Sequence, residues 1–248
     1  PEPIGGSFAL DASASAAGKG AYAARIALDS IEIRNKHRTD RIRPTSVSLH
    51  TDSAATRAEA ASGDLSLTFS TPQSADSLIA ALTRSARTLA GQIDAQSIDM
   101  EQLKPALPDF ALRVSAGPDN ILNSLLKSRK IAFDALNAEG ANCDSLPVSI
   151  RLRTEGLAYG NVVLDTVTAD IRQNGKRLEY ALGLANAPGN LDNIARAGLY
   201  GHLVRNTGQA NLYQRNRAGR EGFRFGLDVT WTDSLVRASV TPPDPLFG

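Results

Sequence analysis

The chain has very little cysteine, few aromatic residues and almost no excess of charge. Cys143 is the one cysteine among 248 residues, so no internal disulfide can form and a disulfide-stapled scaffold is excluded. Aromatic residues make up 5% of the chain, so Ala, Leu, Ile and Val must supply most of the buried surface. The 27 basic and 26 acidic residues leave a net charge of +1, which gives no overall field for nucleic acid or for an anionic membrane.

Long apolar runs and targeting signals are also missing. The sequence has no run of about 18 apolar residues, the length that a membrane-spanning helix needs. It shows no secretory signal peptide. Because the chain begins with Pro1 rather than Met, we expect it to be a segment of a longer protein.

Motifs that carry enzyme chemistry are absent as well. There is no H-E-x-x-H pair for zinc, no G-x-S-x-G nucleophile turn, no phosphate-binding glycine loop and no calcium-loop spacing. Cys143 has no basic neighbour in the sequence that would lower its pKa, and we interpret it as a passive thiol. The histidines are isolated from one another: His37, His50 and His202. We therefore expect no enzyme activity, no metal site and no cofactor.

Carboxylates on predicted strands are the remaining candidates for acid–base chemistry, and they are Asp165, Asp170, Glu179 and Asp228. Asp170 and Asp228 fall on the polar phase of their strands, opposite the apolar side chains. We interpret them as part of a solvated face. A run of basic residues is interpreted in the same way; it comprises Arg215, Arg217, Arg220 and Arg224.

Alternation of apolar and polar residues is the feature that the sequence has in abundance. In FRFGLDVTWTDSLVRASV, residues 223–240, every second position from Phe223 to Trp231 is apolar. A period of two predicts strands with one apolar and one polar face. Asn174-Gly175 lies between two such runs and predicts a type I′ hairpin turn. A change of parity between Leu28 and Ile31 predicts a bulge or bend within one strand.

Residues 72–130 follow a helical period instead. Thr71 is the predicted N-cap and Pro72 the predicted first residue of a long amphipathic helix. Its apolar stripe contains Leu78, Leu82, Leu89 and Ile93. Asp99 is predicted to cap a short turn of helix, the segment from Phe110 to be a strand, and Pro118 to open a further short helix.

Together these patterns predict a mainly β protein with a long, curved antiparallel sheet, formed as an open trough or a partly closed barrel. We divide the chain into a β-rich block at 1–71, a mostly helical insert with one strand at 72–130, and an antiparallel meander at 131–248. The three parts are expected to form one continuous domain.

The open question is what the apolar strand faces cover. They could pack a closed core of the protein itself, or they could line a groove for a molecule that the protein carries. The candidate lining residues are Phe223, Phe225, Leu227, Val229, Trp231, Leu178, Tyr180, Leu182, Leu184, Phe110 and Leu112.

Two stretches resemble the TamB/AsmA-like family of bacterial envelope proteins. LAYGNVVLDTVTADIRQNGKRLEYALGLANAPG at 157–189 resembles the repeated strand–turn–strand phrase of that family. LTFSTPQSADSLIAALTRSARTLAGQIDAQSIDMEQLKPALPDFALRVSAGPDNIL at 67–122 resembles the helical insert of its Bacteroidota versions. The membrane helix at the N-terminus of family members and their C-terminal docking region have no counterpart in this sequence.

The resemblance implies a non-enzymatic, periplasmic protein anchored to the inner membrane through a segment not included in this sequence. It implies an apolar groove for phospholipid acyl chains, or for the β-strands of outer-membrane proteins during their assembly. A BamA-like outer-membrane barrel is the implied partner, through a region not in this chain, and nucleic acid is not expected. The alternative interpretation is a structural, adhesin-like β-domain with a closed core and no ligand.

Overall fold

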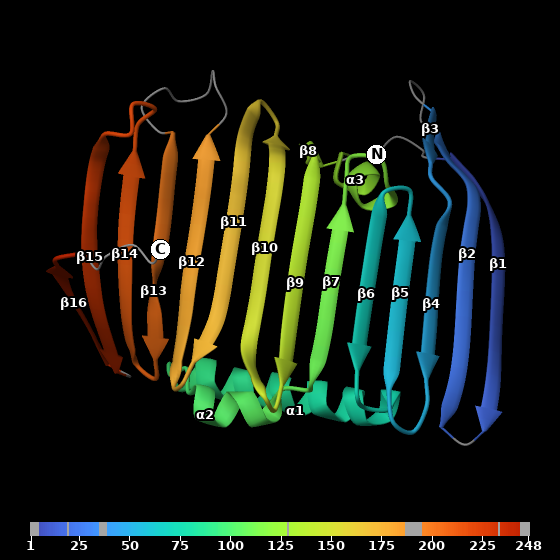
Figure 1. Cartoon of the computed structure of the whole chain (residues 1–248), viewed down its shortest axis with the longest axis horizontal. Coiled ribbons are helices and arrows are strands. Elements are labelled where there is room, and N and C mark those ends of the chain that lie inside the picture. Colours follow the sequence, from blue (N-terminus) through green and yellow to red (C-terminus); the bar gives the residue numbers. More distant parts are fainter. Residues whose placement is uncertain are drawn as a thin grey trace.

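The computed structural model describes residues 5–18, 20–34, 39–127, 129–186, 195–232 and 234–243. Its strands form one antiparallel sheet that is not closed into a barrel (Figure 1). The sheet order is β1-β2-β4-β5-β6-β7-β9-β10-β11-β12-β13-β14-β15-β16, with β3 paired to β2 and β8 paired to β10. The predicted fold class is therefore confirmed in its open form.

Strand bounds follow the alternating segments of the sequence. In the first block they are β1 (Gly5–Gly18), β2 (Ala21–Arg34), β3 (Thr39–Ile42), β4 (Thr45–Thr51), β5 (Thr56–Ser62) and β6 (Leu65–Thr71). The middle of the chain contributes β7 (Phe110–Ala116), β8 (Ile131–Ala132) and β9 (Ala135–Cys143). The last part contributes β10 (Leu146–Tyr159), β11 (Val162–Asn174), β12 (Arg177–Asn186), β13 (Arg196–Val204), β14 (Thr207–Arg215), β15 (Glu221–Thr232) and β16 (Leu235–Thr241).

Local turn chemistry explains two joints of the sheet. Asn174 pairs with Arg177 across the β11–β12 turn, so Gly175 and Lys176 are its two central residues. Of these two, only Gly175 has a positive φ, of 58°. The hairpin is where the sequence predicts it, but the predicted type I′ turn is wrong, because that type needs a positive φ at both central residues. Ser30 has a φ of 55° within β2. Before Ser30 the strand pairs with β4, and after it the strand pairs with β3. The predicted bend in β2 is therefore present.

Helix α1 (Ala75–Asp94) begins later than the sequence predicts. Ser74 is its N-cap and accepts a hydrogen bond from the Ser77 N–H at 3.3 Å. Thr71 instead ends β6, where it pairs with Thr56. The prediction that Thr71 caps this helix is wrong because the cross-strand ladder extends over the position that the N-cap would need.

The other helical elements are short. Asp99 caps α2 (Met100–Leu103) as predicted, because its carboxylate accepts from the Glu101 N–H at 2.9 Å. The 3-10 turn η1 (Lys104–Ala106) follows directly. Helix α3 (Ile121–Lys127) begins three residues after Pro118, with the Asn123 N–H donating to Asn120 Oδ1 at 2.9 Å.

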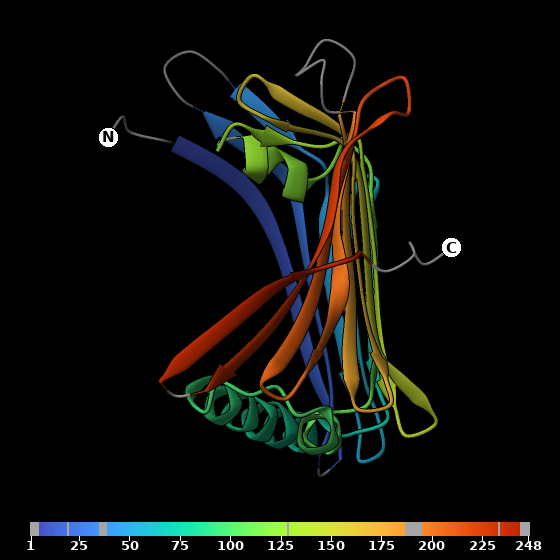
Figure 2. The ribbon, with the colours of Figure 1, turned by 90° about the vertical axis from the view of Figure 1, so that its left-hand side faces the viewer.

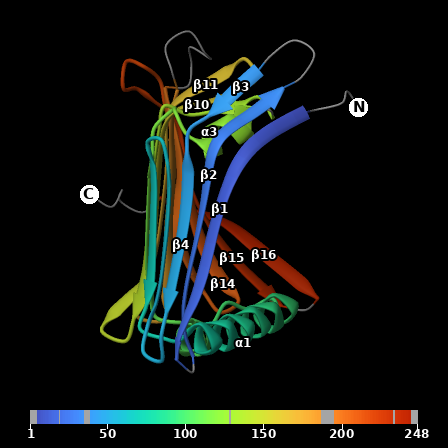
Figure 3. The ribbon, with the colours of Figure 1, turned by 90° about the vertical axis from the view of Figure 1, so that its right-hand side faces the viewer.

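All three helices lie on one side of the sheet, and Figures 2 and 3 show that both edges of the sheet bend toward that side. Helix α1 lies across one end of the strands, and α3 lies near the opposite end. The main buried apolar cluster joins Met100 and Leu103 of α2 to Val148 of β10. The sheet thus has a concave, helix-bearing face and a convex face.

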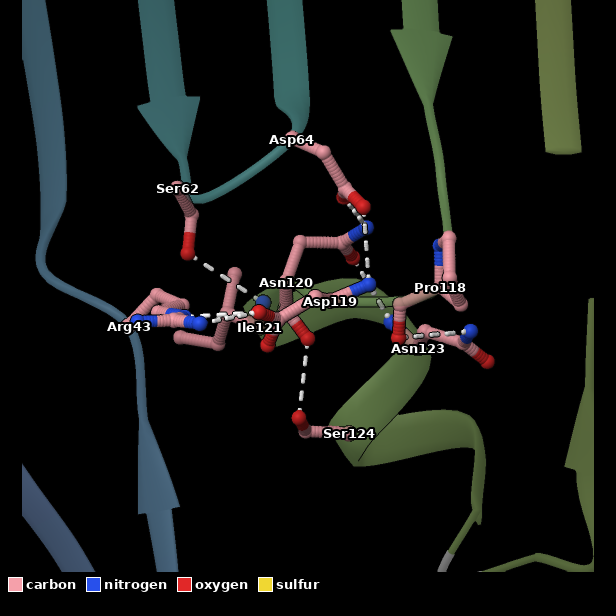
Figure 4. A network of polar contacts seen from close by, with 9 residues as sticks. All are labelled: Arg43, Ser62, Asp64, Pro118, Asp119, Asn120, Ile121, Asn123 and Ser124. Atoms are coloured by element: carbon pink, nitrogen blue, oxygen red, sulfur yellow. Dashed lines mark hydrogen bonds and ion pairs between the residues drawn. The ribbon is translucent and has the colours of Figure 1, made fainter. Parts of the chain in front are cut away.

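A polar network fixes α3 on the concave face (Figure 4). The Asp64 carboxylate accepts from the Asp119 N–H at 2.9 Å and from Asn120 Nδ2 at 2.6 Å. The N–H of Ile121 donates to Ser62 Oγ at 3.2 Å. These contacts tie the start of α3 to the β5–β6 turn, more than fifty residues earlier in the chain.

Candidate functional site

The register of the sheet places apolar residues next to one another across every strand of the main path. One row of directly paired residues crosses fourteen strands and contains no charged side chain. It comprises Ala14, Ala24, Leu49, Ala58, Phe69, Leu112, Gly140, Ile150, Ile171, Tyr180, Gly201, Ala210, Leu227 and Val240. We call the face that carries this row the apolar face.

The neighbouring row, one residue along each strand, points to the opposite face. It comprises Ser13, Arg25, Ser48, Glu59, Thr68, Arg113, Glu139, Arg151, Asp170, Ala181, Tyr200, Asn211, Gly226 and Thr241. Opposite charges form ion pairs within it. Arg113 Nε lies 3.3 Å from Glu139 Oε1, and Arg151 Nε lies 3.4 Å from Asp170 Oδ2. We call this the polar face.

The apolar face is the concave one. Val148 shares the parity of Ile150 on β10, and it packs under α2 on the helix-bearing side. Ser62, which lies at the α3 end, shares the parity of Ala58 on β5 and bonds to the start of α3. Helices α2 and α3 therefore both lie on the apolar face, one near each end of the strands. We call the part of this concave apolar face that lies between the two ends the trough (Figures 2 and 3).

Large apolar side chains in this trough are exposed. Ile150 is 45% exposed, Leu182 43% and Phe225 37%. Further exposed members on the same face include Leu10, Ile26, Val47, Leu49, Leu184, Phe223 and Val240. Because all described strands belong to one sheet, no second sheet within the described part of the chain covers them.

Every residue that the sequence nominated as groove-lining lies on the apolar face. The nominated residues of β15 and β12 lie in the same rows of directly paired residues, which cross β14 and β13. The row-mates are Phe223 with Leu184, Phe225 with Leu182, Leu227 with Tyr180, and Val229 with Leu178. Phe110 and Leu112 share this face on β7. The rings of Phe110 and Phe69 stack with centroids 6.4 Å apart, and those of Phe223 and Phe225 lie 5.9 Å apart.

Some nominated residues are occupied by the protein itself. Leu178 packs against the Met100 cluster and is covered by α2. The Trp231 indole donates to the carbonyl of Gln96, just beyond α1. The Tyr180 hydroxyl donates to the Gln209 carbonyl at 2.9 Å across Gly201, where a Cβ would lie 1.9 Å from that oxygen. Leu178 and Trp231 thus contact the helical segment at one end of the trough, whereas Tyr180 bonds to the backbone of the sheet itself.

Helix α1 buries its small and polar side, which comprises Ala81, Ser85 and Gln92. Ser85 Oγ donates to the Ala106 carbonyl at 2.6 Å. The adjacent apolar stripe is exposed, and its members are Ile79, Leu82, Leu89 and Ile93. The helix that the sequence marks as amphipathic therefore leaves most of its large apolar side chains uncovered.

Sequence reasoning missed the part of the apolar face in the first β block. Phe8 and Leu10 on β1, and Val47 and Leu49 on β4, belong to it and are exposed. The alternation in those strands was visible. The sequence did not show the strand register, which joins these strands to those of the second half in one face.

A second hollow, of about 770 Å³, lies mainly on the polar face of the sheet. Arg113, Arg151 and Asp170 line one part of it, and Tyr200 and Tyr213 another. The charged side chains are already paired across strands. The two tyrosine rings lie 6.3 Å apart. Leu152 and Leu182 of the apolar face are also among the residues that line this hollow.

Ionisable groups on the sheet are arranged as cross-strand pairs. Glu179 accepts from Arg172 at 2.7 Å and from Asn174 at 2.7 Å. Burial opposes ionisation of Glu179, but these hydrogen bonds outweigh it and lower its pKa. Asp170 and Asp228 lie on the polar face, as predicted.

The pKa of the Cys143 thiol is lowered, first by the hydrogen bond with Ser145 and further by backbone N–H groups. The sequence predicted that no basic neighbour lowers this pKa, and the causes are indeed hydrogen bonds in a turn rather than a basic side chain. His37 lies outside the described residues. Within the described ranges, His, Cys, Asp and Glu nowhere gather in threes that could hold a metal ion.

Among the helices of the described residues, none is both long and apolar enough to cross a bilayer. In comparisons with models of known protein families, with curated proteins and with solved structures, nothing matches this chain.

Proposed function

We propose that the trough on the apolar face holds the hydrocarbon chains of lipids, and that the protein is a non-enzymatic carrier or conduit for them. The observation that carries the proposal is the row of fourteen paired residues without a charge, on an open concave face. Burying apolar surface is worth about 25 cal/mol per Å², or about 0.8 kcal/mol for each CH₂ group. An alkyl chain in the trough would gain this energy without any specific polar contact.

The dimensions of the trough suit this cargo. Fourteen strands at a spacing of about 4.8 Å give a path of about 60 Å along the sheet. One leaflet of a bilayer core is about 15 Å thick, half of the ~30 Å total. Several acyl chains could therefore lie in sequence along the trough.

The shape and charge of the chain argue against a second copy as the occupant. A concave surface needs a convex partner, and the convex face of this chain carries the charged polar row. Docking that row on Leu182 and Phe225 would remove its charges from water without new partners, which is costly. Slender, flexible hydrocarbon has neither problem.

The finer function rests on the family resemblance. We propose that the lipids are phospholipids moving between bacterial membranes in the periplasm, in a protein of the TamB/AsmA-like type. Assembly of outer-membrane β-strands with a BamA-like partner is the other role of that type. Such strands would need an apolar surface of the same kind.

Lipid analysis of the purified protein tests the proposal. We expect mass spectrometry of an organic extract to find phospholipid bound to the wild type. Leu182→Glu with Phe225→Glu should abolish it, because two carboxylates would enter the trough. The matched control is Ala181→Glu with Thr230→Glu, which places the same charges on the same strands but on the polar face. Wild-type protein free of lipid, or equal lipid in both variants, would overturn the proposal.

A photo-crosslinking pair makes the test independent of folding defects. Benzoylphenylalanine at position 182 should crosslink to lipid, whereas the same group at position 181 should not. Equal crosslinking at the two positions would show that contact with lipid is non-specific.

A further inference from the structure

One end of the molecule exposes basic and apolar side chains together. We call this surface the tip patch, and its members are Leu125, Lys127, Arg129, Lys130, Tyr159 and Val162. They come from α3, the segment after it and the β10–β11 turn. The Gly160 N–H donates to the Lys130 carbonyl at 2.9 Å, and Tyr159 pairs with Ile131. Figures 2 and 3 show α3 and the β10–β11 turn at the same end, away from α1.

The tip patch has a local positive charge that the balanced composition conceals. Lys127, Arg129 and Lys130 are all exposed, and none forms an ion pair with another described residue. Residues 121–133 contain no Asp or Glu. The α1 end differs, because its charges are mixed: Arg205 lies 3.4 Å from Asp99, and Lys176 lies 3.1 Å from Glu101.

The apolar members of the tip patch are exposed as well. Tyr159 is 69% exposed, Leu125 55% and Val162 53%. Tyr159 and Val162 flank a tight turn in which Gly160 has a φ of 59°, so both project from the end of a hairpin. Tyr is enriched where proteins meet the bilayer interface, because its ring is apolar and its hydroxyl is polar.

We propose that the tip patch binds the surface of a bilayer containing anionic phospholipids. The basic side chains would meet the headgroup phosphates, while Tyr159, Val162 and Leu125 enter the interfacial region. A nucleic acid would satisfy the charges but leave the three apolar side chains in water. The membrane contact is inferred from the tip patch alone. The further step, that lipid enters the trough from this membrane, rests on the proposed function.

Vesicle flotation tests the inference. Wild-type protein should float with vesicles of phosphatidylcholine and phosphatidylglycerol, and only weakly with phosphatidylcholine alone. Each basic residue contributes about fivefold to partition, so K127Q/R129Q/K130Q should bind on the order of a hundredfold more weakly. Y159S/V162S should also weaken binding, although it leaves the charge unchanged.

The matched control removes three exposed basic residues elsewhere, as R84Q/R87Q/R237Q, and should float like the wild type. If this control and K127Q/R129Q/K130Q lose flotation equally, binding depends only on net charge and the inference is overturned. So would wild-type binding that ignores lipid charge, or a labelled oligonucleotide that binds more tightly than the vesicles. All six basic positions are exposed, so thermal unfolding should be unchanged.

Lipid content separates this inference from the proposed function. If K127Q/R129Q/K130Q loses flotation but still co-purifies with lipid, both proposals hold. If the wild type contains lipid and never floats, the membrane contact is wrong while the trough proposal survives. If the wild type floats but contains no bound lipid, the membrane contact holds and the trough proposal is wrong.

Discussion

The two ends of the apolar face carry helices that are held by different forces. At the α2 end, Met100 is 1% exposed and packs with Leu103 and Val148. At the α3 end, Asn120 and Asn123 are 1% and 0% exposed, and hydrogen bonds satisfy them. Phe133 is also buried there, and its backbone N–H and carbonyl both form hydrogen bonds with the Asn123 side chain.

The difference shows how the helices can be held at the two ends while the apolar face between them stays exposed. Apolar packing is non-directional, and at the α2 end the burial of Met100 and Leu103 acts together with hydrogen bonds such as that from Ser85 to the Ala106 carbonyl. Hydrogen bonds are directional, and at the α3 end they fix a short helix at one position over the strands without needing a large core. Neither end draws on the apolar side chains in the middle of the trough, which stay exposed. The following substitutions break or sharpen this comparison.

Met100→Ala should have the largest effect. Removing a fully buried Met side chain costs about 2–5 kcal/mol through lost transfer energy and the cavity left behind. Urea unfolding should show this loss, and Met100→Leu, which conserves volume, should cost less than about 1.5 kcal/mol. A cost for Met100→Ala no greater than that of Met100→Leu would contradict the apolar assignment of this end.

Asn123→Ala should have the next largest effect. Asn123 Nδ2 donates to the carbonyls of Phe133 at 2.8 Å and Pro118 at 3.1 Å, and its Oδ1 accepts from the Phe133 N–H at 3.3 Å. Leaving buried backbone groups unpaired costs about 1–3 kcal/mol. The control on the same helix is Leu125→Gln, an exposed site where the change should stay within about 0.5 kcal/mol. Equal stability of the two variants in urea would show that the polar network does not hold α3 in place.

Acid should weaken the contacts of Asp64 at the α3 end, and this effect is the smallest. Burial opposes ionisation of Asp64, but hydrogen bonds from Asn120 and from backbone N–H groups lower its pKa. A carboxylate with a lowered folded pKa stabilises the fold above its unfolded pKa of about 3.9, and the contribution is lost as pH falls through the folded pKa. The stability difference between wild type and Asp64→Asn should therefore narrow below about pH 4. A difference independent of pH in that range would show that Asp64 titrates alike in both states.

Much of the fold could be predicted from local patterns. The period of two in 223–240, the hairpin near Asn174-Gly175 and the Asp99 cap all depend on residues within a few positions of one another, and all three are present, although the hairpin turn is not of the predicted type I′. The start of α1 could not be predicted in this way, because the β5–β6 ladder extends over Thr71. The position of α3 was also hidden, since it depends on contacts between Asp64 and Asn120, 56 residues apart.

The candidate site shows the same division. The nominated residues share one face because parity along a strand is a local property, and the sequence is sufficient for that. That Leu178 is covered by α2 while Leu182, four residues along β12, is 43% exposed depends on where the helix packs. The sequence by itself determined which side of each strand is apolar. Only the tertiary structure decided that fourteen such sides join in one row and remain open, because register and helix placement arise from contacts between residues far apart in the chain.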